Sequence, residues 1–348
     1  MKKNSLLTAL VASLFINTAT PREAENQIPR YVVMEEPRAY NISPEYASAI
    51  DTLRNYFSDY VKAAGKKGRL TKNDKVSFVV YDIGNDTYVV NEKGNDQVMA
   101  ASTIKVFALS LFFEMVDSGK LVYGWMDRDN LRKMIKLSDN KATNTVIRNI
   151  GYALGMPVES APDAAQAVLM DKHPEFAKTE IREFIPENGR DNGRTYRNMT
   201  SAMDLVEYYR RLWDRTLPYS DEMLKYLGLP KNTRLFTGGC NTSEDFNKTG
   251  TLYGQVSDAG LVLIKGSDGK DHPYVIAAII EDRTKTIEAN RKKSYGRWVR
   301  ERETIIRDLS KQVYMTLYRE HIGKDYTCKP PVKKPVKKAI KKPTKRYR

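Results

Sequence analysis

The segment from Thr103 to Val116 is apolar on nearly every side of a predicted helix. Its apolar members are Ile104, Val106, Phe107, Leu109, Leu111, Phe112, Phe113 and Met115. A helix of this kind is stable only when other elements surround it, because contact on one face alone would leave many of these side chains in water. The chain must therefore fold with this helix in the middle of a domain. Its 348 residues, 41% of them hydrophobic, supply enough apolar side chains for such a core.

The segments around this helix predict one mixed domain over residues 44–322. Amphipathic helices are expected at about 45–64 and 301–317, strands at 76–83, 88–91, 246–252, 258–264 and 274–280, and further helices at about 129–150 and 202–212. Strands thus occur early and late, with a helical block between them. This order predicts an α/β (α+β) fold, with one antiparallel sheet flanked by helices and an all-helical lobe inserted in the chain.

The two ends of the chain differ from the body in charge. Lys2 and Lys3 precede an apolar run from Leu6 to Ile16, which predicts an export signal over residues 1–20 and thus a periplasmic or secreted protein. An irregular leader is expected over 21–43. Residues 323–348 form a Lys- and Pro-rich tail, expected to be disordered because like charges repel and Pro breaks helices. Two interpretations of the tail stay open: a solvated end, or a tether to a polyanion such as an anionic wall polymer.

The charge and the scattered histidines exclude several classes of protein. The formal net charge is +15, but the two ends carry most of it, so a basic groove for specific nucleic-acid binding is not expected. The three histidines and two cysteines lack metal-ligand spacing, so neither a metal nor another cofactor is expected. In an exported protein, Cys240 and Cys328 can form a disulfide or remain unpaired. A monomer is expected.

Three short motifs contain side chains of the types that enzymes use in catalysis. Ser102 and Lys105 lie one turn apart at the start of the buried helix, where burial lowers the basicity of a lysine enough for it to accept a serine proton. Ser138-Asp139-Asn140 places a hydroxyl and a carboxamide at a helix junction. Lys248-Thr249-Gly250-Thr251 places a cation and hydroxyls on a strand, with a glycine that permits close approach. Alone, the first motif is explained equally well by an ordinary helix cap, whereas the second is better explained by a turn or cap and the third by an edge strand.

Taken in this order, the motifs resemble those of class A-like serine β-lactamases and penicillin-binding transpeptidases. Flanking residues extend the resemblance over about residues 45–320: Met99-Ala100-Ala101, the stretch MIKLSDNKATN and Asp258-Ala259-Gly260. The resemblance implies a β-lactamase/transpeptidase-like fold and an acyl-enzyme mechanism. Its implied roles are Ser102 as nucleophile, Lys105 as base or proton relay, Ser138 as proton donor to the leaving nitrogen, Asn140 as a ligand of the substrate amide, Lys248, Thr249 and Thr251 as the carboxylate site, and the N–H groups of Ser102 and Thr251 as the oxyanion hole.

One part of the class A pattern has no clear counterpart. Class A enzymes carry a deacylating glutamate in an ExxLN-like loop between the second and third motifs. Here residues 174–200 offer Glu175, Glu180, Glu183 and Glu187, none with the expected neighbours, and Glu183 and Glu187 are the candidates. The expected function is an exported serine hydrolase that opens the β-lactam amide. The alternative is a DD-peptidase, a carboxypeptidase or endopeptidase acting on peptidoglycan stem peptides. A missing glutamate would favour the alternative, because the acyl-enzyme would then be long-lived.

Overall fold

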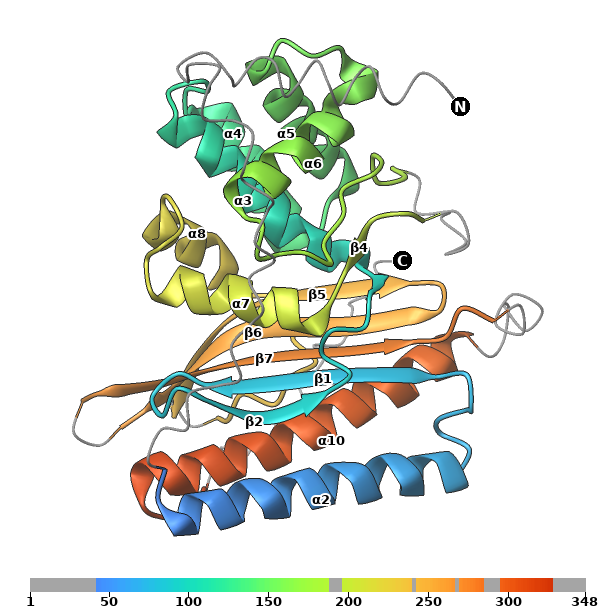
Figure 1. Cartoon of the computed structure of the whole chain (residues 1–348), viewed down its shortest axis with the longest axis vertical. Helices are drawn as coiled ribbons and strands as arrows, with labels where there is room; N and C mark the ends of the chain where they lie inside the picture. Colours follow the sequence, from blue (N-terminus) through green and yellow to red (C-terminus); the bar gives the residue numbers. More distant parts are fainter. Residues whose placement is uncertain (1–41, 188–195, 240–241, 267–268, 285–294, 328–348) are drawn as a thin grey trace, which may run out of the picture.

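The computed structural model describes residues 42–187, 196–239, 242–266, 269–284 and 295–327. The predicted export signal, most of the predicted leader, nearly all of the basic tail and both cysteines lie outside these residues. Within them, a central sheet has helices on both faces (Figure 1). No helix in these ranges is long and apolar enough to cross a membrane.

The sheet has five antiparallel strands in the order β2-β1-β7-β6-β5. Their bounds are β1 (Lys75–Asp82), β2 (Thr87–Glu92), β5 (Ser243–Leu252), β6 (Gln255–Lys265) and β7 (Asp271–Glu281). β6 and β7 are buried on both faces along nearly their whole length. A separate two-stranded sheet pairs β3 (Val98–Met99) with β4 (Met199–Thr200). β5 is an edge strand of the main sheet. Its free side contacts residues 101–103, which follow β3.

Two long helices, α2 (Pro44–Lys66) and α10 (Tyr295–Ile322), cover one face of the sheet (Figure 1). α2 begins there because the Ser43 hydroxyl accepts a hydrogen bond from the Tyr46 N–H and proline occupies the first helical position. α10 begins earlier than the sequence pattern predicts. Tyr326 packs against Tyr314 at 5.2 Å between ring centroids, so the folded part extends beyond the expected boundary at residue 322.

The other face packs against the helical lobe, which has α3 at its centre. The elements on this side are η1 (Ala101–Thr103), α3 (Ile104–Asp117), α4 (Trp125–Arg132), a π-helical turn η2 (Lys133–Leu137), α5 (Asn140–Ala153), η3 (Val158–Ser160), α6 (Ala161–Lys172), α7 (Ala202–Trp213) and α8 (Ser220–Leu227). Nearly every side chain of α3 is buried, as its composition predicts. The predicted sheet, its flanking helices and the inserted lobe are confirmed. The sequence pattern missed α6 because its many alanines give little amphipathic contrast.

Candidate active site

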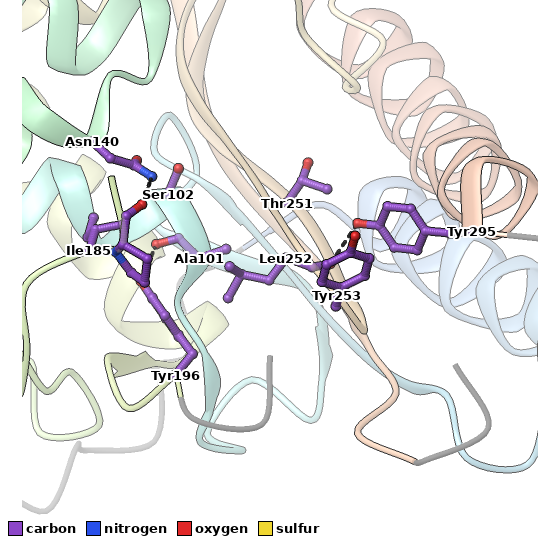
Figure 2. Close-up of a pocket in the computed structure, with 10 residues that line it drawn as sticks. Ala101, Ser102, Asn140, Ile185, Tyr196, Thr251, Leu252, Tyr253 and Tyr295 are labelled. Atoms are coloured by element: carbon purple, nitrogen blue, oxygen red, sulfur yellow. Dashed lines mark hydrogen bonds between the residues drawn. The ribbon is translucent and has the colours of Figure 1, made fainter. Parts of the chain in front are cut away.

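Ser102 lies in η1, the short turn that joins β3 to α3. The preceding residue, Ala101, has a left-handed φ of 47°, which costs a residue with a side chain about 1–3 kcal/mol. Neighbouring hydrogen bonds hold this turn. The Tyr196 hydroxyl donates to the Ala101 carbonyl at 2.8 Å, and the Thr103 hydroxyl donates to the Ala100 carbonyl at 2.5 Å. The turn therefore presents Ser102 at the wall of a pocket (Figure 2).

Lys105 lies in the first turn of α3 and is completely buried. Its ammonium nitrogen is 2.6 Å from the Ser138 carbonyl oxygen, 3.2 Å from the Ser138 Oγ and 2.8 Å from the Asn140 Oδ1. Burial lowers the pKa of Lys105 well below its usual value, and the positive charge of Lys248 lowers it further, although Asp139 opposes both. A lysine whose pKa is lowered in this way gives up its proton more readily and can act as a base.

The second motif reaches Lys105 through an unusual backbone path. The π-helical turn η2 ends at Ser138, which has a left-handed φ of 57°. The next residue, Asp139, caps α5 by accepting a hydrogen bond from the Ala142 N–H at 2.7 Å. This reversal turns both the carbonyl and the hydroxyl of Ser138 toward Lys105. Asn140 then donates through its Nδ2 to the Pro186 carbonyl at 2.8 Å, which connects the lysine to the loop on the far side of the pocket.

The third motif brings a second lysine to the same serine. Lys248, on β5, donates to the Ser138 Oγ at 3.0 Å and to the Thr249 carbonyl at 2.9 Å. Burial lowers the pKa of Lys248 to about 7; Asp258 opposes this shift, while the positive charges of Lys231 and Arg234 add to it. The Ser138 hydroxyl therefore lies between two lysines whose pKa values are both lowered by burial.

Arg234 is a further member of the site that the motifs did not reveal. Its guanidinium donates to the Thr251 Oγ1 at 2.6 Å and to the Ser257 carbonyl at 2.9 Å, and Glu303 holds it through an ion pair of 3.0 Å. It thus places a positive charge beside the hydroxyl of Thr251, and it is close enough to Lys248 to lower the pKa of that lysine. This arrangement suits a carboxylate. Arg234 precedes the motif by more than a dozen residues without a local pattern, so only the fold assigns it to the site.

Gly250 lets β5 approach the serine turn closely. A Cβ at this position would lie 2.5 Å from the Ser257 Oγ, 3.0 Å from the Ala101 Cβ and 3.3 Å from the Ser102 nitrogen. A Cβ here would require the Ser257 hydroxyl to move and the turn at Ala101 and Ser102 to shift by a few tenths of an ångström. The glycine of the third motif thus sets the spacing between the nucleophile turn and the strand that carries Lys248 and Thr251.

These elements enclose a pocket of about 200 Å³. It is lined by Ala101, Ser102, Asn140, Ile185, Pro186, Tyr196, Thr251, Leu252, Tyr253 and Tyr295 (Figure 2). Hydrogen bonds or pocket contacts thus bring together Ser102, Lys105, Ser138, Asn140, Lys248 and Thr251, and Thr249 lies between the last two on β5. The oxyanion role of the Ser102 and Thr251 N–H groups stays a prediction.

The two candidate deacylating glutamates do not line the pocket. Glu183 accepts hydrogen bonds from the main-chain N–H of Arg197 at 2.8 Å and from its Nε at 2.9 Å. Glu187 accepts from the Asn144 Nδ2 at 3.3 Å and lies 3.5 Å from the Arg148 guanidinium. Among the described residues, the pocket lining contains no carboxylate, and Ile185 and Pro186 occupy the wall next to Asn140.

Comparisons with known proteins agree with this arrangement. The model of the "Beta-lactamase enzyme family" matches residues 52–124 and 127–317. The fold is similar to that of PBP-A, with a TM-score of 0.57 and 20% identity over 78% of this chain and 97% of that one. It is also similar to a β-lactamase from Sphaerobacter thermophilus (TM-score 0.55, 19% identity, 75% and 95% covered) and to an ancestral class A β-lactamase, GNCA (0.54, 18%, 75% and 98%).

At these identities the likeness to solved structures shows the fold alone. No curated protein sequence matches the chain. The family model, however, spans more than half of the chain and includes all three motifs that meet at the pocket. The chain therefore belongs to the beta-lactamase enzyme family, a group of serine hydrolases with the β-lactamase/transpeptidase-like fold.

Proposed function

We propose that this protein is a penicillin-binding DD-peptidase, which acylates Ser102 readily and releases the acyl group slowly. The observation that carries this proposal is the pocket itself. The groups needed for acylation meet at this pocket. Among the residues that the structure describes, none that lines it has a carboxylate to activate a hydrolytic water. Of the two activities that the sequence left open, this combination favours the peptidase over a fast β-lactamase. Formation of the acyl-enzyme itself is supported by the structurally similar PBP-A, a leucine-to-glutamate variant of which has been solved as an acyl-enzyme complex with penicillin G.

The acylation step uses the geometry around Lys105 and Ser138. Neutral Lys105 accepts the Ser102 proton as the Ser102 Oγ attacks the substrate carbonyl, and the N–H groups of Ser102 and Thr251 stabilise the oxyanion. As the carbon–nitrogen bond breaks, Ser138 gives its proton to the leaving nitrogen. Protonated Lys105 can return a proton to Ser138 across 3.2 Å, and Lys248 lies 3.0 Å away as a second donor. The substrate carboxylate binds at Lys248, Thr251 and Arg234.

The decisive experiment is a time course of intact protein mass after mixing with penicillin G. We expect an adduct of one penicillin per chain that persists for hours. An adduct that forms and disappears within minutes would instead identify a β-lactamase with an efficient deacylating group. If no adduct forms at any concentration, the acyl-enzyme proposal is overturned.

Replacing Ile185 with glutamate is expected to shorten the lifetime of the adduct by at least about 10-fold, since a positioned general base typically contributes 10²–10⁴-fold. Ile185 lines the pocket and is nearly buried, so a carboxylate there would have a raised pKa and could take a proton from water. The measurement is the rate at which the adduct mass is lost. Ile185→Gln is the matched control, because it has the same shape without the base, and equal lifetimes in the two variants would contradict the prediction.

Replacing Gly250 with alanine is expected to slow acylation by up to about 10²-fold, the cost of a full 1 Å displacement of the reacting groups. The added methyl group would displace the Ser102 turn from β5. The measurement is the second-order rate constant of adduct formation. Gly65→Ala is the control: a Cβ at Gly65, in α2, would meet nothing within 4 Å. Acylation at the wild-type rate in Gly250→Ala would show that the close approach is not needed.

The titration of Lys248 predicts a specific pH dependence of acylation. Above about pH 7, free enzyme loses the positive charge of Lys248, so the second-order rate constant should fall as pH rises. In the complex the bound carboxylate favours the protonated lysine, so the rate constant at saturating penicillin should not fall at the same pH. Lys248→Arg, which stays charged, should remove the fall. A second-order constant that is flat from pH 6 to 9 in the wild type would contradict this assignment.

Export and the role of the basic tail remain proposals from the sequence. An exported peptidase with a polycationic tail would be held close to an anionic wall polymer, where its peptide substrate lies. Deleting residues 328–348 is a direct test, because binding to isolated cell-wall material at low salt would then be lost while the reaction with penicillin G is kept.

A further inference from the structure

Asp258 lies on β6, where it pairs with Thr249 of the neighbouring strand β5. Its side chain is completely buried, and it does not line the pocket. The mechanism above gives this carboxylate no role. Because burial of an ionised carboxylate is costly unless donors surround it, the contacts of Asp258 indicate what it is there to hold.

Four hydrogen-bond donors surround the Asp258 carboxylate. Its Oδ2 accepts from the Thr233 hydroxyl at 3.0 Å, from the Arg234 main-chain N–H at 2.6 Å and from the Leu235 main-chain N–H at 3.4 Å. Its Oδ1 accepts from the Asn247 Nδ2 at 2.8 Å. All four groups donate, and none of the four is itself charged. This pattern matches an ionised carboxylate, which can only accept.

The contacts at Oδ2 hold the segment that carries Arg234. Lys231 fixes the start of this segment, because its ammonium group donates to main-chain carbonyls at and just after the end of α8. Asp258 then holds the main chain at residues 233–235, while Glu303 holds the guanidinium of Arg234 at its far end. The position of that guanidinium beside the Thr251 hydroxyl therefore depends on both carboxylates.

The negative charge of Asp258 also acts on Lys248. It opposes the burial that lowers the pKa of Lys248, whereas the positive charges of Lys231 and Arg234 add to the lowering. Lys105, on α3, is a further cation whose charge interacts with that of Lys248. Lys248 thus faces three cations, and Asp258 supplies a negative charge against them.

We propose that Asp258 is a positioning residue for the substrate carboxylate, which holds the segment that carries Arg234 and supplies the negative charge that favours the ammonium form of Lys248. The inference rests on the proposed acylation of Ser102 by substrates whose carboxylate binds at these two cations and Thr251. Asp258 acts through the two cations and not on the reacting atoms. Loss of its charge should therefore weaken the capture of substrates with a carboxylate and leave the chemical step unchanged.

Asp258→Asn removes the charge and can keep the contacts. The new amide can present its oxygen to residues 233–235 and its NH₂ group to Asn247. The side chain of Asn247 can turn its amide over to accept this NH₂ group, because among the described residues its own Oδ1 is buried without a hydrogen-bond partner. The variant therefore separates the charge of Asp258 from its shape.

Asp204→Asn is the matched control. Asp204 is a buried aspartate on α7 that also accepts from hydroxyl and main-chain donors, here those of Thr179, Ser201 and Lys178. It does not line the pocket. Its replacement measures the effect of losing a buried carboxylate elsewhere in the fold.

The test compares penicillin G with its methyl ester, which lacks the carboxylate charge. The second-order rate constant of adduct formation is measured for both at pH 7, together with the rate constant at saturating penicillin G. In Asp258→Asn, the second-order constant for penicillin G should fall by about 10-fold, the change expected when a neighbouring charge shifts a pKa by one unit. The constant for the ester and the rate constant at saturation should stay within about threefold. Asp204→Asn should keep the wild-type ratio of acid to ester.

The pH profile is a readout that a merely structural role would not move. Without the nearby carboxylate Lys248 loses its proton more easily, so the fall of the second-order constant with rising pH should begin about 1 pH unit lower in Asp258→Asn. Thr233→Val removes one hydrogen bond to Asp258 and leaves the charge. It should lower the constant for penicillin G, and thus the ratio of acid to ester, without moving the pH at which the fall begins.

The outcomes separate the role of Asp258 from the acyl-enzyme mechanism. Equal losses for penicillin G and its ester in Asp258→Asn, or an unchanged pH profile, would overturn the proposal while leaving acylation of Ser102 intact. If Asp258→Asn does not fold, a wild-type ratio of acid to ester in Thr233→Val would overturn it instead. A wild type that reacts equally fast with acid and ester would overturn the carboxylate site and the role of Asp258 together. Failure of penicillin G to form an adduct with the wild type would overturn the proposed function itself.

Discussion

Replacing Ser102 with alanine is expected to abolish the covalent adduct with penicillin G, while Ser138→Ala should still form it, more slowly. The structure makes this comparison necessary. Both serines are close to lysines, and it is Ser138 whose Oγ lies within hydrogen-bond distance of Lys105 and Lys248. Ser102, however, lines the pocket, and its backbone nitrogen lies next to the position of Gly250 on β5. A reacting carbonyl therefore meets Ser102, and Ser138 is placed to move a proton.

Intact mass and peptide mapping of the adduct measure this difference. The penicilloyl mass should be located on the peptide containing Ser102 in the wild type and in Ser138→Ala, and it should be missing in Ser102→Ala. Ser118→Ala, on the exposed C-cap of α3, is the control for substitution of a serine in the same helical region. A full adduct in Ser102→Ala, or an adduct mapped to Ser138, would reverse the two assignments.

Replacing Lys105 with methionine is expected to slow acylation by about 10³-fold, within the range attributed to a positioned general base. Methionine fills a similar volume but cannot accept the Ser102 proton. It also lacks the hydrogen bonds to the Ser138 carbonyl and the Asn140 Oδ1. The measurement is the rate constant of adduct formation at saturating penicillin G. This constant should also lose its dependence on pH in the acid range, because the group that must be deprotonated is gone.

The stability of Lys105→Met distinguishes loss of a base from loss of the fold. Because the pKa of Lys105 is well below its usual value in the folded protein, the lysine opposes folding at neutral pH. Methionine does not lose stability by burying an ionisable group. This gain offsets the stability lost with the hydrogen bonds of the lysine, so the midpoint of thermal unfolding should stay close to that of the wild type. Lys141→Met, at an exposed position on α5, is the matched control. Acylation within 10-fold of the wild-type rate in Lys105→Met would exclude the lysine as the base.

Much of the fold and the central part of the site could be predicted from short-range patterns. The apolar helix from Thr103 to Val116 had to be buried, and α3 is buried. The spacing of Ser102 and Lys105 depends only on the turn of a helix. The two later motifs indicate the family only together with the first and in this chain order. That order places one of them in the helical block and the other on a late strand.

Glu183 and Glu187 show what short-range patterns cannot predict, which is the direction of a side chain on a loop. Both glutamates lie in the expected stretch of sequence, but Arg197 holds one carboxylate, and Arg148 and Asn144 hold the other. Which way a loop side chain points is decided by partners on other elements. No local spacing encodes those partners.

The sequence by itself determined the family, the buried central helix and the three motifs with their nucleophile and lysines, because each depends on residues within a few positions of one another. The tertiary structure alone decided that Arg234 joins the carboxylate site, that Ile185 and Pro186 stand in the pocket wall, and that Tyr253 meets Tyr295. These residues are far apart in the chain. Their contacts exist only after β5 has paired at the edge of the sheet and α10 has packed beneath it, where the ion pair between Arg302 and Asp74 holds the first turns of the helix.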